Sequence, residues 1–372
     1  MSTLVIIHFA PLELYPPIQN LLRELASERK YGRVVVYTTR QASGHLKELD
    51  SPSSNITIVR LAKSGGGLPA LTRYMQYFIF FTLCFLALAL KRPGRILYFE
   101  TISSWPVYLY RRYLGRPQIF IHYHEYNSPE DLKNGMKLVR FFHSRENWLY
   151  PRATLVSQTN VFRLEKFLTD ILPVKIKQTS VLPNFPPRSW QFPPKLNLIL
   201  PLKIVYAGAL SIDTMFTTEL CRWVIRHKDE VSWDIYSNNC APEARQYIQS
   251  LKSDCVRLFE GVSYDELPRL LCTYDLGVVL YKGHIPNYIW NAPNKLFEYL
   301  ACGLSVLVPL LMTGSLPYVT NLQYPSVSAV NFEQLDTVRP IDLLHGKDYV
   351  RSQASFFSDD ALKPLLETLA VN

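Results

Sequence analysis

Residues 291–309, NAPNKLFEYLACGLSVLVP, combine residue types that suit the binding of a phosphate group. Asn291 can cap a helix, Pro293 suits a first helical turn, and apolar residues follow at helical spacing. The free amides and the dipole of a helix start favour an anion, and Lys295 adds positive charge there. The first-turn N–H groups are therefore expected to point into the cleft, toward such an anion.

Glu298 lies one turn further along this predicted helix, four residues after Asn294 and three after Lys295. A carboxylate at that point can accept paired hydrogen bonds from vicinal hydroxyls, such as those of a ribose. A phosphate at the helix start and a diol one turn away indicate a nucleoside diphosphate. The alternative is a structural glutamate whose charge is satisfied by Lys295.

Polar or small residues also follow several predicted strands, at the points where the strands end. In open parallel sheets, ligands bind outside the carboxyl ends of the strands. In the first half of the chain these residues are Pro11, Glu13, Tyr15, Glu100, His124 and Glu125. In the second half they are Gly208, Ala209, Asn238, Gly261, Val262 and Lys282. For any single loop, the alternative is an ordinary turn.

Short β-rich runs alternate with segments of helical spacing, such as Ile18–Ser27 and Leu138–Leu149. This alternation predicts an α/β fold with parallel sheets covered on both faces. The strands expected in the first half are Thr3–His8, Arg33–Thr38, Ile56–Arg60, Arg95–Phe99, Gln118–His122 and Thr154–Ser157. The strands expected in the second half are Lys203–Tyr206, Ser232–Tyr236, Val256–Phe259, Leu276–Leu280 and Ser305–Val308.

The alternation breaks at residues 181–201, which contain six prolines and no convincing helix. Such a stretch is typical of a linker, and 372 residues suit two domains. We expect two Rossmann-like, doubly wound domains that face a cleft. The expected segments are a first domain over 1–185, a linker over 186–202, a second domain over 203–350 and a C-terminal helix over 351–372 that packs back on the first domain.

The net charge of +9 is concentrated in the first half of the chain. Residues 1–190 carry 25 Lys and Arg and 12 Asp and Glu, a net +13, whereas residues 191–372 carry a net −4. This asymmetry indicates a polyanionic partner, and nucleic acid is disfavoured because no recognised binding motif accompanies the charge. Six scattered cysteines without metal-ligand spacing are typical of structural thiols in a reducing compartment.

Residues 74–90 form the one candidate for membrane contact. These 17 uncharged residues, flanked by Arg73 and by Lys91 and Arg92, fall just short of the length that spans a bilayer. We expect a helix packed on a sheet, with one face on an anionic membrane, rather than a transmembrane helix. The expected location is therefore the cytoplasm, peripherally at the inner face of the cell membrane.

Residues 293–309 resemble the donor-site signature of retaining glycosyltransferases of the GT-B fold, in the large sucrose-synthase-like family often numbered four (glycosyl transferases group 1). The usual form of that signature is P-x-K-x-x-E-x-x-A-x-G-x-P-V. Three further segments match in the right order, namely IHYHEYNSP, VLPNFPP and KIVYAGAL. The resemblance covers nearly the whole chain and is strongest over residues 203–309.

The resemblance implies transfer of a sugar, with retained configuration and without a bound metal, from a UDP- or GDP-sugar to a saccharide or lipid-linked acceptor. It implies that Glu298 binds the ribose of the donor. It also implies that the amides near Asn294 and Lys295 bind the diphosphate. Gly208 would allow close approach of the donor phosphate, and His124 would lie near the transferred sugar. The remaining residues expected on the donor side are Ala209, Asn238, Gly261, Val262, Lys282, Asn291 and Leu296, and those on the acceptor side are Pro11, Glu13, Tyr15, Glu100 and Glu125.

The sequence departs from the family pattern in three places. Trp290 stands where many relatives carry a sugar-binding glutamate, which leaves Asn287, Tyr288 or Asn291 to contact the sugar. No basic residue follows Gly208 closely, so Lys282 or Lys295 must neutralise the phosphates. A glycine pair common after the first strand is replaced by Ala10 and Pro11.

Three alternatives remain open at this point. The first is a nucleotide-sugar epimerase of the same architecture, and the second is a non-catalytic binding protein that keeps the fold. The third is a metal site at the HxHE segment, where His122 and His124 share a strand face but no third ligand is predictable. The favoured hypothesis is a glycosyltransferase in cell-surface polysaccharide or glycolipid synthesis.

Overall fold

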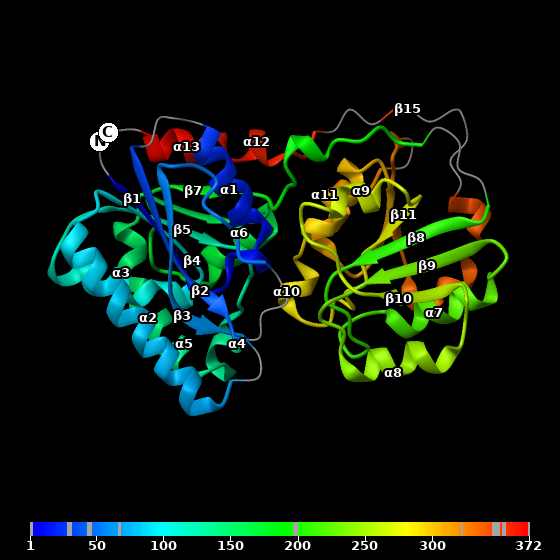
Figure 1. Ribbon diagram of the computed structural model, residues 1–372, viewed down its shortest axis with the longest axis horizontal. Helices are drawn as coiled ribbons and strands as arrows, with labels where there is room; N and C mark the ends of the chain where they lie inside the picture. Colours follow the sequence, from blue (N-terminus) through cyan, green and yellow to red (C-terminus); the bar gives the residue numbers. More distant parts are fainter. Residues whose placement is uncertain are drawn as a thin grey trace. The chain divides into compact units, whose positions relative to one another are not determined.

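The computed structural model describes residues 3–27, 32–42, 47–65, 68–195, 200–320, 323–343, 350–351 and 355–370. The chain divides into two compact units (Figure 1). The first domain contains residues 1–184 and 358–372, and the second contains residues 185–357. The linker expected over 186–202 includes residues 196–199, which lie outside the described residues.

The first domain is built on a parallel sheet of seven strands in the order β3-β2-β1-β4-β5-β6-β7. Its strands are β1 (Thr3–His8), β2 (Arg33–Gln41), β3 (Ile56–Ser64), β4 (Arg95–Phe99), β5 (Gln118–Tyr123), β6 (Leu155–Gln158) and β7 (Thr179–Val181). Its helices are α1 (Pro16–Ser27), α2 (Ala70–Lys91), α3 (Ser104–Tyr113), α4 (Pro129–Asn134), α5 (Lys137–Leu149) and α6 (Val161–Asp170). The order 3-2-1-4-5-6 is that of a Rossmann fold.

Strand β1, TLVIIH, is apolar on both faces because both faces of the sheet are covered. Val5 and Ile7 pack in a core shared with α2, α3 and α5. Leu4 and Ile6 pack in the opposite core, shared with α1. Figure 1 shows α1 on one side of the sheet and α2 and α5 on the other.

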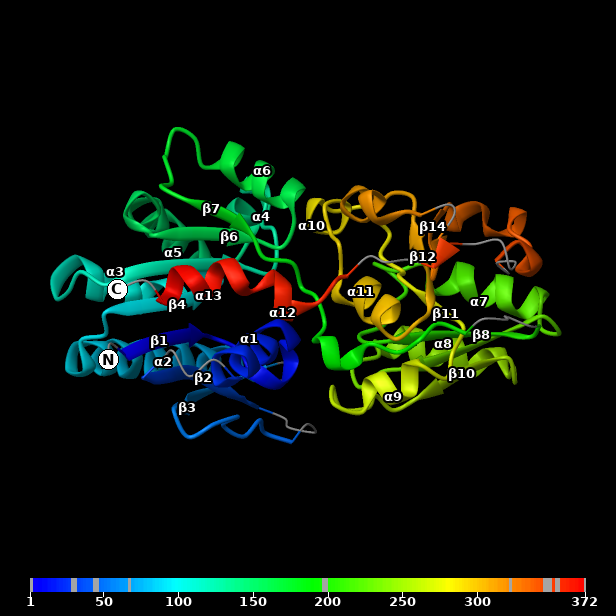
Figure 2. The ribbon, with the colours of Figure 1, turned by 90° about the horizontal axis from the view of Figure 1, so that it is seen from above.

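The end of the chain completes this second core. Two short helices, α12 (Ser358–Ala361) and α13 (Lys363–Ala370), replace the single helix expected over 351–372. Leu362, Leu365, Leu366 and Leu369 are buried with the leucines of α1. Figure 2 shows the α12–α13 segment in red along the sheet of the first domain. Residues 352–354, 371 and 372 of the expected helix lie outside the described residues.

The second domain contains a parallel sheet of six strands in the order β10-β9-β8-β11-β12-β14. Its strands are β8 (Leu202–Ala207), β9 (Val231–Tyr236), β10 (Val256–Phe259), β11 (Leu276–Val278), β12 (Ser305–Pro309) and β14 (Val327–Val330). Its helices are α7 (Thr217–Arg226), α8 (Pro242–Leu251), α9 (Leu267–Leu271), α10 (Pro286–Ile289) and α11 (Asn294–Ala301). A separate pair joins β13 (Gln323–Tyr324) to β15 (Val350–Arg351). Helices α7 and α8 cover one face, and α9 and α11 cover the other.

All eleven expected strands are present, with ends that agree to within four residues. Strands β7, β13, β14 and β15 were not expected. β7 (TSV) and β14 (VSAV) are short and contain hydroxyl and small residues, so no clear apolar run marks them. The α/β prediction for both domains is therefore confirmed.

Candidate functional site

The first turn of α11 presents two backbone amides that have no partner among the described residues. The N-cap position is held by Pro293, with φ −73° and ψ 154°, and no side chain caps the helix. No described group accepts a hydrogen bond from the N–H of Asn294 or of Lys295. The N–H of Leu296 donates to the carbonyl of Pro293 at 3.0 Å. The amides expected to meet the diphosphate, those of Asn294 and Lys295, are therefore available to an anion, and that of Leu296 is not.

Asn291 does not cap α11, because the helix starts at Asn294 and not at the predicted position. Pro293 fits the N-cap, where the backbone is extended and no N–H is needed. The N–H of Asn291 donates to the carbonyl of Tyr288 at 3.2 Å, and its carbonyl accepts from Oγ of Ser315 at 2.9 Å. The backbone of Asn291 is therefore held in the loop that precedes the helix.

Gly208 and Lys295 are in direct contact. Gly208 follows β8 with φ +140°, a conformation that favours glycine. A Cβ atom at Gly208 would lie 2.6 Å from Nζ of Lys295, which also lies 5.4 Å from the ring centroid of Tyr206. The N–H of Ala207 donates to the hydroxyl of Tyr299 at 3.1 Å, which ties α11 to the end of β8. Glycine is favoured here by the positive φ, and its lack of a side chain leaves room for the ammonium group.

Lys295 keeps its positive charge at neutral pH. Burial by itself lowers the pKa of this lysine, but the hydroxyls of Tyr281 and Tyr206 and the carboxylate of Glu298 raise it by more. The pKa of Lys295 therefore lies above its ordinary value. The charged ammonium group and the unpartnered amides of α11 lie at the same helix end, where the helix dipole adds further positive potential.

Glu298 is buried, and its carboxylate forms no hydrogen bond or ion pair with a described residue. Its side chain is 6 % exposed, and burial raises its pKa to about 7, while Lys295 acts in the opposite direction. No described residue forms an ion pair with this carboxylate or donates a hydrogen bond to it. The structure therefore does not form the ion pair with Lys295 on which the structural alternative depends. A buried carboxylate without a partner is costly, and ligand hydroxyls would reduce that cost.

Three tyrosines near Lys295 were given no role in the sequence analysis. They are Tyr206, Tyr281 and Tyr299. Burial raises the pKa of Tyr206 and of Tyr299, so both hydroxyls stay protonated. The hydroxyl of Tyr206 donates to the carbonyl of Ala209 at 2.6 Å, which fixes the residue after Gly208. The only sequence signal was the position of Tyr206 and Tyr281 at the ends of predicted strands.

Asn238 holds together the loops that follow β9 and β10. Its Oδ1 accepts from the N–H of Gly261 at 2.9 Å, and its Nδ2 donates to the carbonyl of Gly261 at 3.2 Å. A Cβ at Gly261 would lie 2.8 Å from that Nδ2. Val262, the next residue, is partly buried. The structure thus brings these predicted residues to one edge of the sheet, where Asn238 shapes the loop.

Lys282 is engaged by the protein itself. Its Nζ donates to the carbonyl of Ile212 at 2.9 Å, and its backbone N–H donates to the carbonyl of Thr214 at 3.0 Å. Lys282 therefore fixes the loop that follows Ala209. Of the two lysines expected to neutralise phosphates, Lys295 is the one whose ammonium group has no hydrogen bond to a described residue.

In the first domain, Glu100 has a strained backbone at the end of β4. Its φ of +63° and ψ of 150° fall in a region that residues other than glycine rarely adopt. Its Oε1 accepts from the N–H of His124 at 2.7 Å. Burial and the nearby Glu125 raise the pKa of Glu100 to about 8. The backbone N–H groups of His124 and Glu125 and the charge of Arg163 lower this pKa, but by less. Glu100 thus fixes the loop that carries His124 and Glu125.

His124 is buried and neutral. Its ring stacks on Phe99, with centroids 5.2 Å apart and an interplanar angle of 6°. Nδ1 lies 3.4 Å from Oδ1 of Asn184, whereas Nε2 is buried and has no hydrogen-bond partner among the described residues. Burial lowers the pKa of His124 to about 4. The imidazole therefore offers an uncharged hydrogen-bonding nitrogen at this sheet edge.

Tyr15 and His8 lie beside His124. The ring centroids of His8 and Tyr15 are 4.3 Å apart, and those of Tyr15 and His124 are 5.9 Å apart. Neither ring nitrogen of His8 has a hydrogen-bond partner among the described residues, and burial holds its pKa well below the usual range. His8 was not among the predicted site residues, although it ends β1. Burial and the two acids Glu100 and Glu125 raise the pKa of Tyr15.

Glu13 is committed to the protein scaffold. Its Oε1 lies 2.7 Å from the guanidinium of Arg60 and accepts from the N–H of Leu49 at 2.7 Å. Pro11 is buried, and its carbonyl accepts from the N–H of Leu14. Of the predicted acceptor-side residues, the structure brings Tyr15, Glu100 and Glu125 together near His124, and it uses Glu13 and Pro11 to shape the loop after β1.

No group of three or more His, Cys, Asp or Glu side chains among the described residues could hold a metal ion. In the HxHE segment, Nδ1 of His122 lies 2.9 Å from Oγ of Ser157, and His122 and His124 have ring centroids 4.7 Å apart. All six cysteines are free thiols.

No protein-family model matches the chain, and no curated protein matches it in sequence. Solved structures nevertheless match over its whole length. HepE from Anabaena, in complex with UDP and glucose, has a TM-score of 0.71 and 13 % identity, with 100 % of both chains covered. The lipopolysaccharide outer core galactosyltransferase WaaB has a TM-score of 0.63 and 11 % identity, with 99 % of both chains covered.

A third match is a structure from Listeria monocytogenes named as a UDP-N-acetylglucosamine 2-epimerase, with a TM-score of 0.60 and 11 % identity, covering 99 % of this chain and 95 % of that one. At sequence identities this low, the similarity shows a shared fold and nothing more. The two parallel sheets, of seven and six strands, and the agreement with these structures confirm the predicted architecture. The chain therefore has the GT-B fold, which glycosyltransferases and a sugar-nucleotide epimerase share.

Proposed function

We propose that this protein is a glycosyltransferase that moves a sugar from a UDP- or GDP-sugar to a saccharide or lipid-linked acceptor. The observation that carries the proposal is the group formed by the free first-turn amides of α11, the charged Lys295 against Gly208, and the unpaired carboxylate of Glu298. These groups suit a diphosphate followed by a ribose. Similarity in fold to structures that hold UDP and UDP-glucose supports the same donor class.

The main chemical demand in such a transfer is the negative charge that develops on the departing diphosphate. Helix-start amides and a preorganised cation stabilise that charge without reorganisation at the moment of reaction. Lys295 is the cation that we assign to this role, because Lys282 is bound to the carbonyl of Ile212. The departing phosphate can itself accept the proton of the acceptor hydroxyl, so the proposal needs no carboxylate base and no metal.

In the first domain we assign a sugar-contacting role to His124. Its neutral Nε2 can exchange a hydrogen bond with a sugar hydroxyl, and the stack on Phe99 fixes its ring. Glu100 acts through the N–H of His124 and is therefore a positioning residue. Tyr15 and Glu125 are the neighbouring groups proposed to meet the acceptor.

We further propose that the anomeric configuration is retained, as the resemblance of residues 293–309 implies. The proposed setting is the cytoplasmic face of the cell membrane, and the proposed product is a surface polysaccharide or a glycolipid. The support for this setting is the basic, partly apolar first domain and the fold shared with a lipopolysaccharide galactosyltransferase.

A donor screen tests the proposal. Purified protein is incubated with UDP- and GDP-sugars, and nucleotide release and thermal stabilisation by UDP and GDP are measured. We expect one nucleotide to stabilise the protein, Lys295→Met and Glu298→Gln to remove that effect, and Lys282→Met to keep most of it. No stabilisation by either nucleotide, in protein shown to be folded, would overturn the assignment. Proton NMR of the product bond tests retention.

The second candidate is a nucleotide-sugar epimerase, which the fold match to the Listeria structure supports. An epimerase would use the same donor groups but no acceptor. The two candidates separate in one assay, because conversion of a UDP-sugar into its isomer without any acceptor supports the epimerase, whereas transfer to an added saccharide supports the transferase.

A further inference from the structure

Helix α2 exposes a row of large apolar side chains on its outer side. Leu71, Phe78 and Leu90 are 76 %, 72 % and 85 % exposed. Other exposed apolar residues of the helix are Tyr74, Met75, Leu83 and Leu86. Single exposed apolar residues are common on soluble proteins, but a contiguous row along six turns marks an interaction surface. The described residues contain this one helix long and apolar enough to cross a membrane, and 28 % of its most apolar window is buried.

The inner side of α2 belongs to the core of the first domain. Tyr77, Phe80, Phe81, Cys84 and Leu88 are buried there. Gln76 also binds the domain, because its Oε1 accepts from the N–H of Lys63 at 2.7 Å. A helix that crossed a bilayer would remove these side chains from the core. The helix must therefore use only its outer side for any apolar partner.

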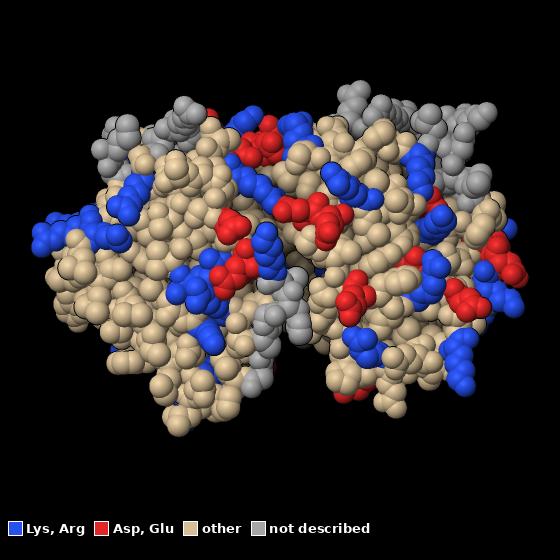
Figure 3. All heavy atoms as spheres, viewed as in Figure 1, with Lys and Arg blue, Asp and Glu red and all other residues tan. Residues whose placement is uncertain are grey.

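The charges around this outer side are positive. Residues 68–116, which contain α2 and α3, carry seven Lys and Arg but a single acid, Glu100. That acid is bonded to the N–H of His124 at the end of β4. Basic residues stand near both ends of α2, at Arg73, Lys91 and Arg92. Figure 3 shows a broad uncharged surface over the part of the molecule that α2 occupies in Figure 1, with basic side chains at its left edge.

Helix α5 extends the same surface with cations held on aromatic rings. The guanidinium groups of Arg112 and Arg152 lie 5.3 Å and 3.9 Å from the ring centroid of Trp148, and that of Arg145 lies 4.8 Å from Phe141. The one acid of α5, Glu146, is fully buried and bonded to the hydroxyls of Tyr98 and Tyr123. It therefore adds no negative charge to the surface.

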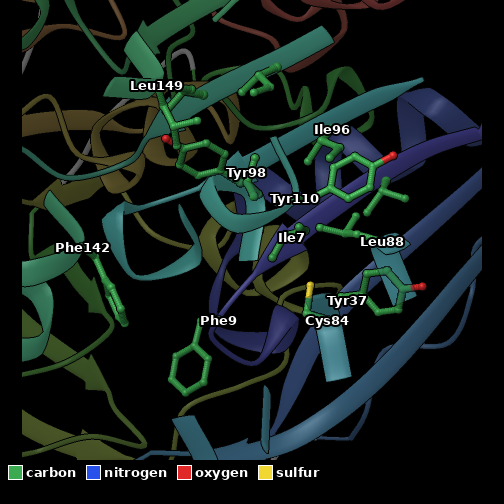
Figure 4. Packing of buried hydrophobic residues seen from close by; sticks show 14 of the residues in the cluster. Ile7, Phe9, Tyr37, Cys84, Leu88, Ile96, Tyr98, Tyr110, Phe142 and Leu149 are labelled. Atoms are coloured by element: carbon green, nitrogen blue, oxygen red, sulfur yellow. The ribbon is translucent and has the colours of Figure 1, made fainter. Parts of the chain in front are cut away.

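Helices α2, α3 and α5 form one layer on this side of the sheet. The rings of Phe81 in α2 and Phe142 in α5 are 5.0 Å apart, and Trp105 of α3 lies 5.7 Å from Phe142. Figure 4 shows Cys84 and Leu88 of α2 directed toward Tyr37 and Ile7 of the sheet. The apolar row and the cations on rings thus belong to one continuous helical surface, which we call the α2–α3–α5 surface.

We propose that the α2–α3–α5 surface docks on the headgroup region of an anionic phospholipid bilayer, with α2 lying in the plane of the interface. The apolar row would enter the boundary between headgroups and acyl chains, where Trp and Tyr rings are also favoured. The surrounding Arg and Lys would meet lipid phosphates. A second copy of the chain fits poorly, because a symmetric contact would bring two positive rims together. This inference does not depend on the proposed reaction.

Vesicle flotation of the full chain tests this docking. The probes are vesicles of phosphatidylcholine alone and of equimolar phosphatidylcholine and phosphatidylglycerol. We expect binding to the anionic vesicles, weakened by high salt, little binding to the neutral ones, and release by alkaline carbonate. Equal binding to both vesicles, binding to neither, or resistance to carbonate would overturn the proposal.

Matched variants locate the surface. Leu71→Ser, Phe78→Ser and Leu90→Ser are combined, and the control combines Leu172→Ser, Leu310→Ser and Ile341→Ser, which are also exposed leucine and isoleucine positions. A third protein combines Arg112→Gln, Arg145→Gln and Arg152→Gln, with Lys228→Gln, Arg245→Gln and Arg269→Gln as its control. We expect the α2 variant to lose binding and each removed arginine to weaken it about fivefold, with both controls unchanged.

Circular dichroism and melting temperature establish that each variant is folded. Unchanged binding by a folded α2 variant would overturn the proposal. So would sedimentation as a dimer that Phe78→Ser dissociates, because the surface would then be an interface between copies. Nucleotide stabilisation of the variants should stay at the parent level, which keeps this outcome separate from that of the glycosyltransferase assay.

Discussion

The two domains share a strand order but carry different chemistry at corresponding strand ends. Strand β8 occupies in its sheet the place that β1 occupies in the first. After β8, Gly208 makes room for a charged lysine from α11, whereas β1 ends in a buried, uncharged His8. The first sheet edge thus presents neutral imidazoles and one acid, Glu100, with a raised pKa, and the second presents a cation and free amides. Topology determines where a ligand binds, and the side chains determine its charge.

The largest expected effect concerns the cation of the second domain. Lys295→Met removes the one charge that we assign to the departing diphosphate, so we expect kcat to fall about 10²–10³-fold. Lys282→Met is the matched control, and its effect should be much smaller because its ammonium group is bound to the carbonyl of Ile212. Steady-state kinetics measure both. Equal losses in the two variants would remove the distinction between the lysines.

Gly208→Ala tests the room that the second domain leaves for Lys295. The new Cβ would meet Nζ at 2.6 Å in a backbone conformation that disfavours alanine. Gly65→Ala is the control, because Gly65 has φ +135° but its nearest neighbour atom would be 3.7 Å away. We expect the free energy of unfolding to fall by about 1–3 kcal/mol in each of the two variants. Only Gly208→Ala should also lose nucleotide binding. Denaturant melts with and without UDP measure this.

Glu298 should make the affinity of the second domain for a nucleotide depend on pH. The carboxylate form accepts hydrogen bonds from ribose hydroxyls, and the pKa of Glu298 in the free protein is about 7. Affinity for the favoured nucleotide should therefore fall as the pH drops below 7, by up to about tenfold per pH unit. Calorimetry from pH 5.5 to 8.5 measures it. Glu298→Gln should bind weakly and lose this part of the pH dependence; an unchanged profile would contradict the role.

Glu100 supplies the smallest effect, and it acts on stability. Its pKa is about 8 in the folded protein, above its ordinary value of 4.5. Between these values the folded protein holds a proton that the unfolded chain has released. The stability from the protonated carboxyl is therefore complete below pH 4.5 and is lost as the pH rises toward 8.

Glu100→Gln should lack this pH dependence. The melting temperature of the variant minus that of the parent should therefore increase from pH 5 to pH 8. Thermal melts at intervals of half a pH unit measure the difference. Nucleotide binding should stay unchanged in Glu100→Gln, because Glu100 belongs to the first domain. A parallel dependence in parent and variant would show that another group causes the slope.

The sequence predicts the fold better than the contacts within the site. Alternating apolar runs are a local property, so strands such as Thr3–His8 and Val256–Phe259 were predicted with their observed ends. The short β7 (TSV) and β14 (VSAV) were missed because they contain hydroxyl and small residues and form no clear apolar run. The break at Leu362 between α12 and α13 was also missed.

Within the candidate site, the motif predicts which residues gather but not how each is used. Lys282 and Lys295 look equivalent in sequence, yet one is held by the carbonyl of Ile212 and the other lies against Gly208. The amide of Leu296 donates to the carbonyl of Pro293, the residue that caps the helix in place of the predicted Asn291. The strained backbone of Glu100 depends on contacts between distant segments, which no local pattern records.

The buried leucines of α12 and α13 have a consequence for biosynthesis. A ribosome that has translated residues 1–184 has made every strand of the first sheet but none of the leucines that cover α1. Those leucines emerge only after the entire second domain, so the nascent first domain waits with an uncovered apolar face. Domains generally fold in the order of synthesis. In this chain we expect the domain that is translated first to be the last to finish folding.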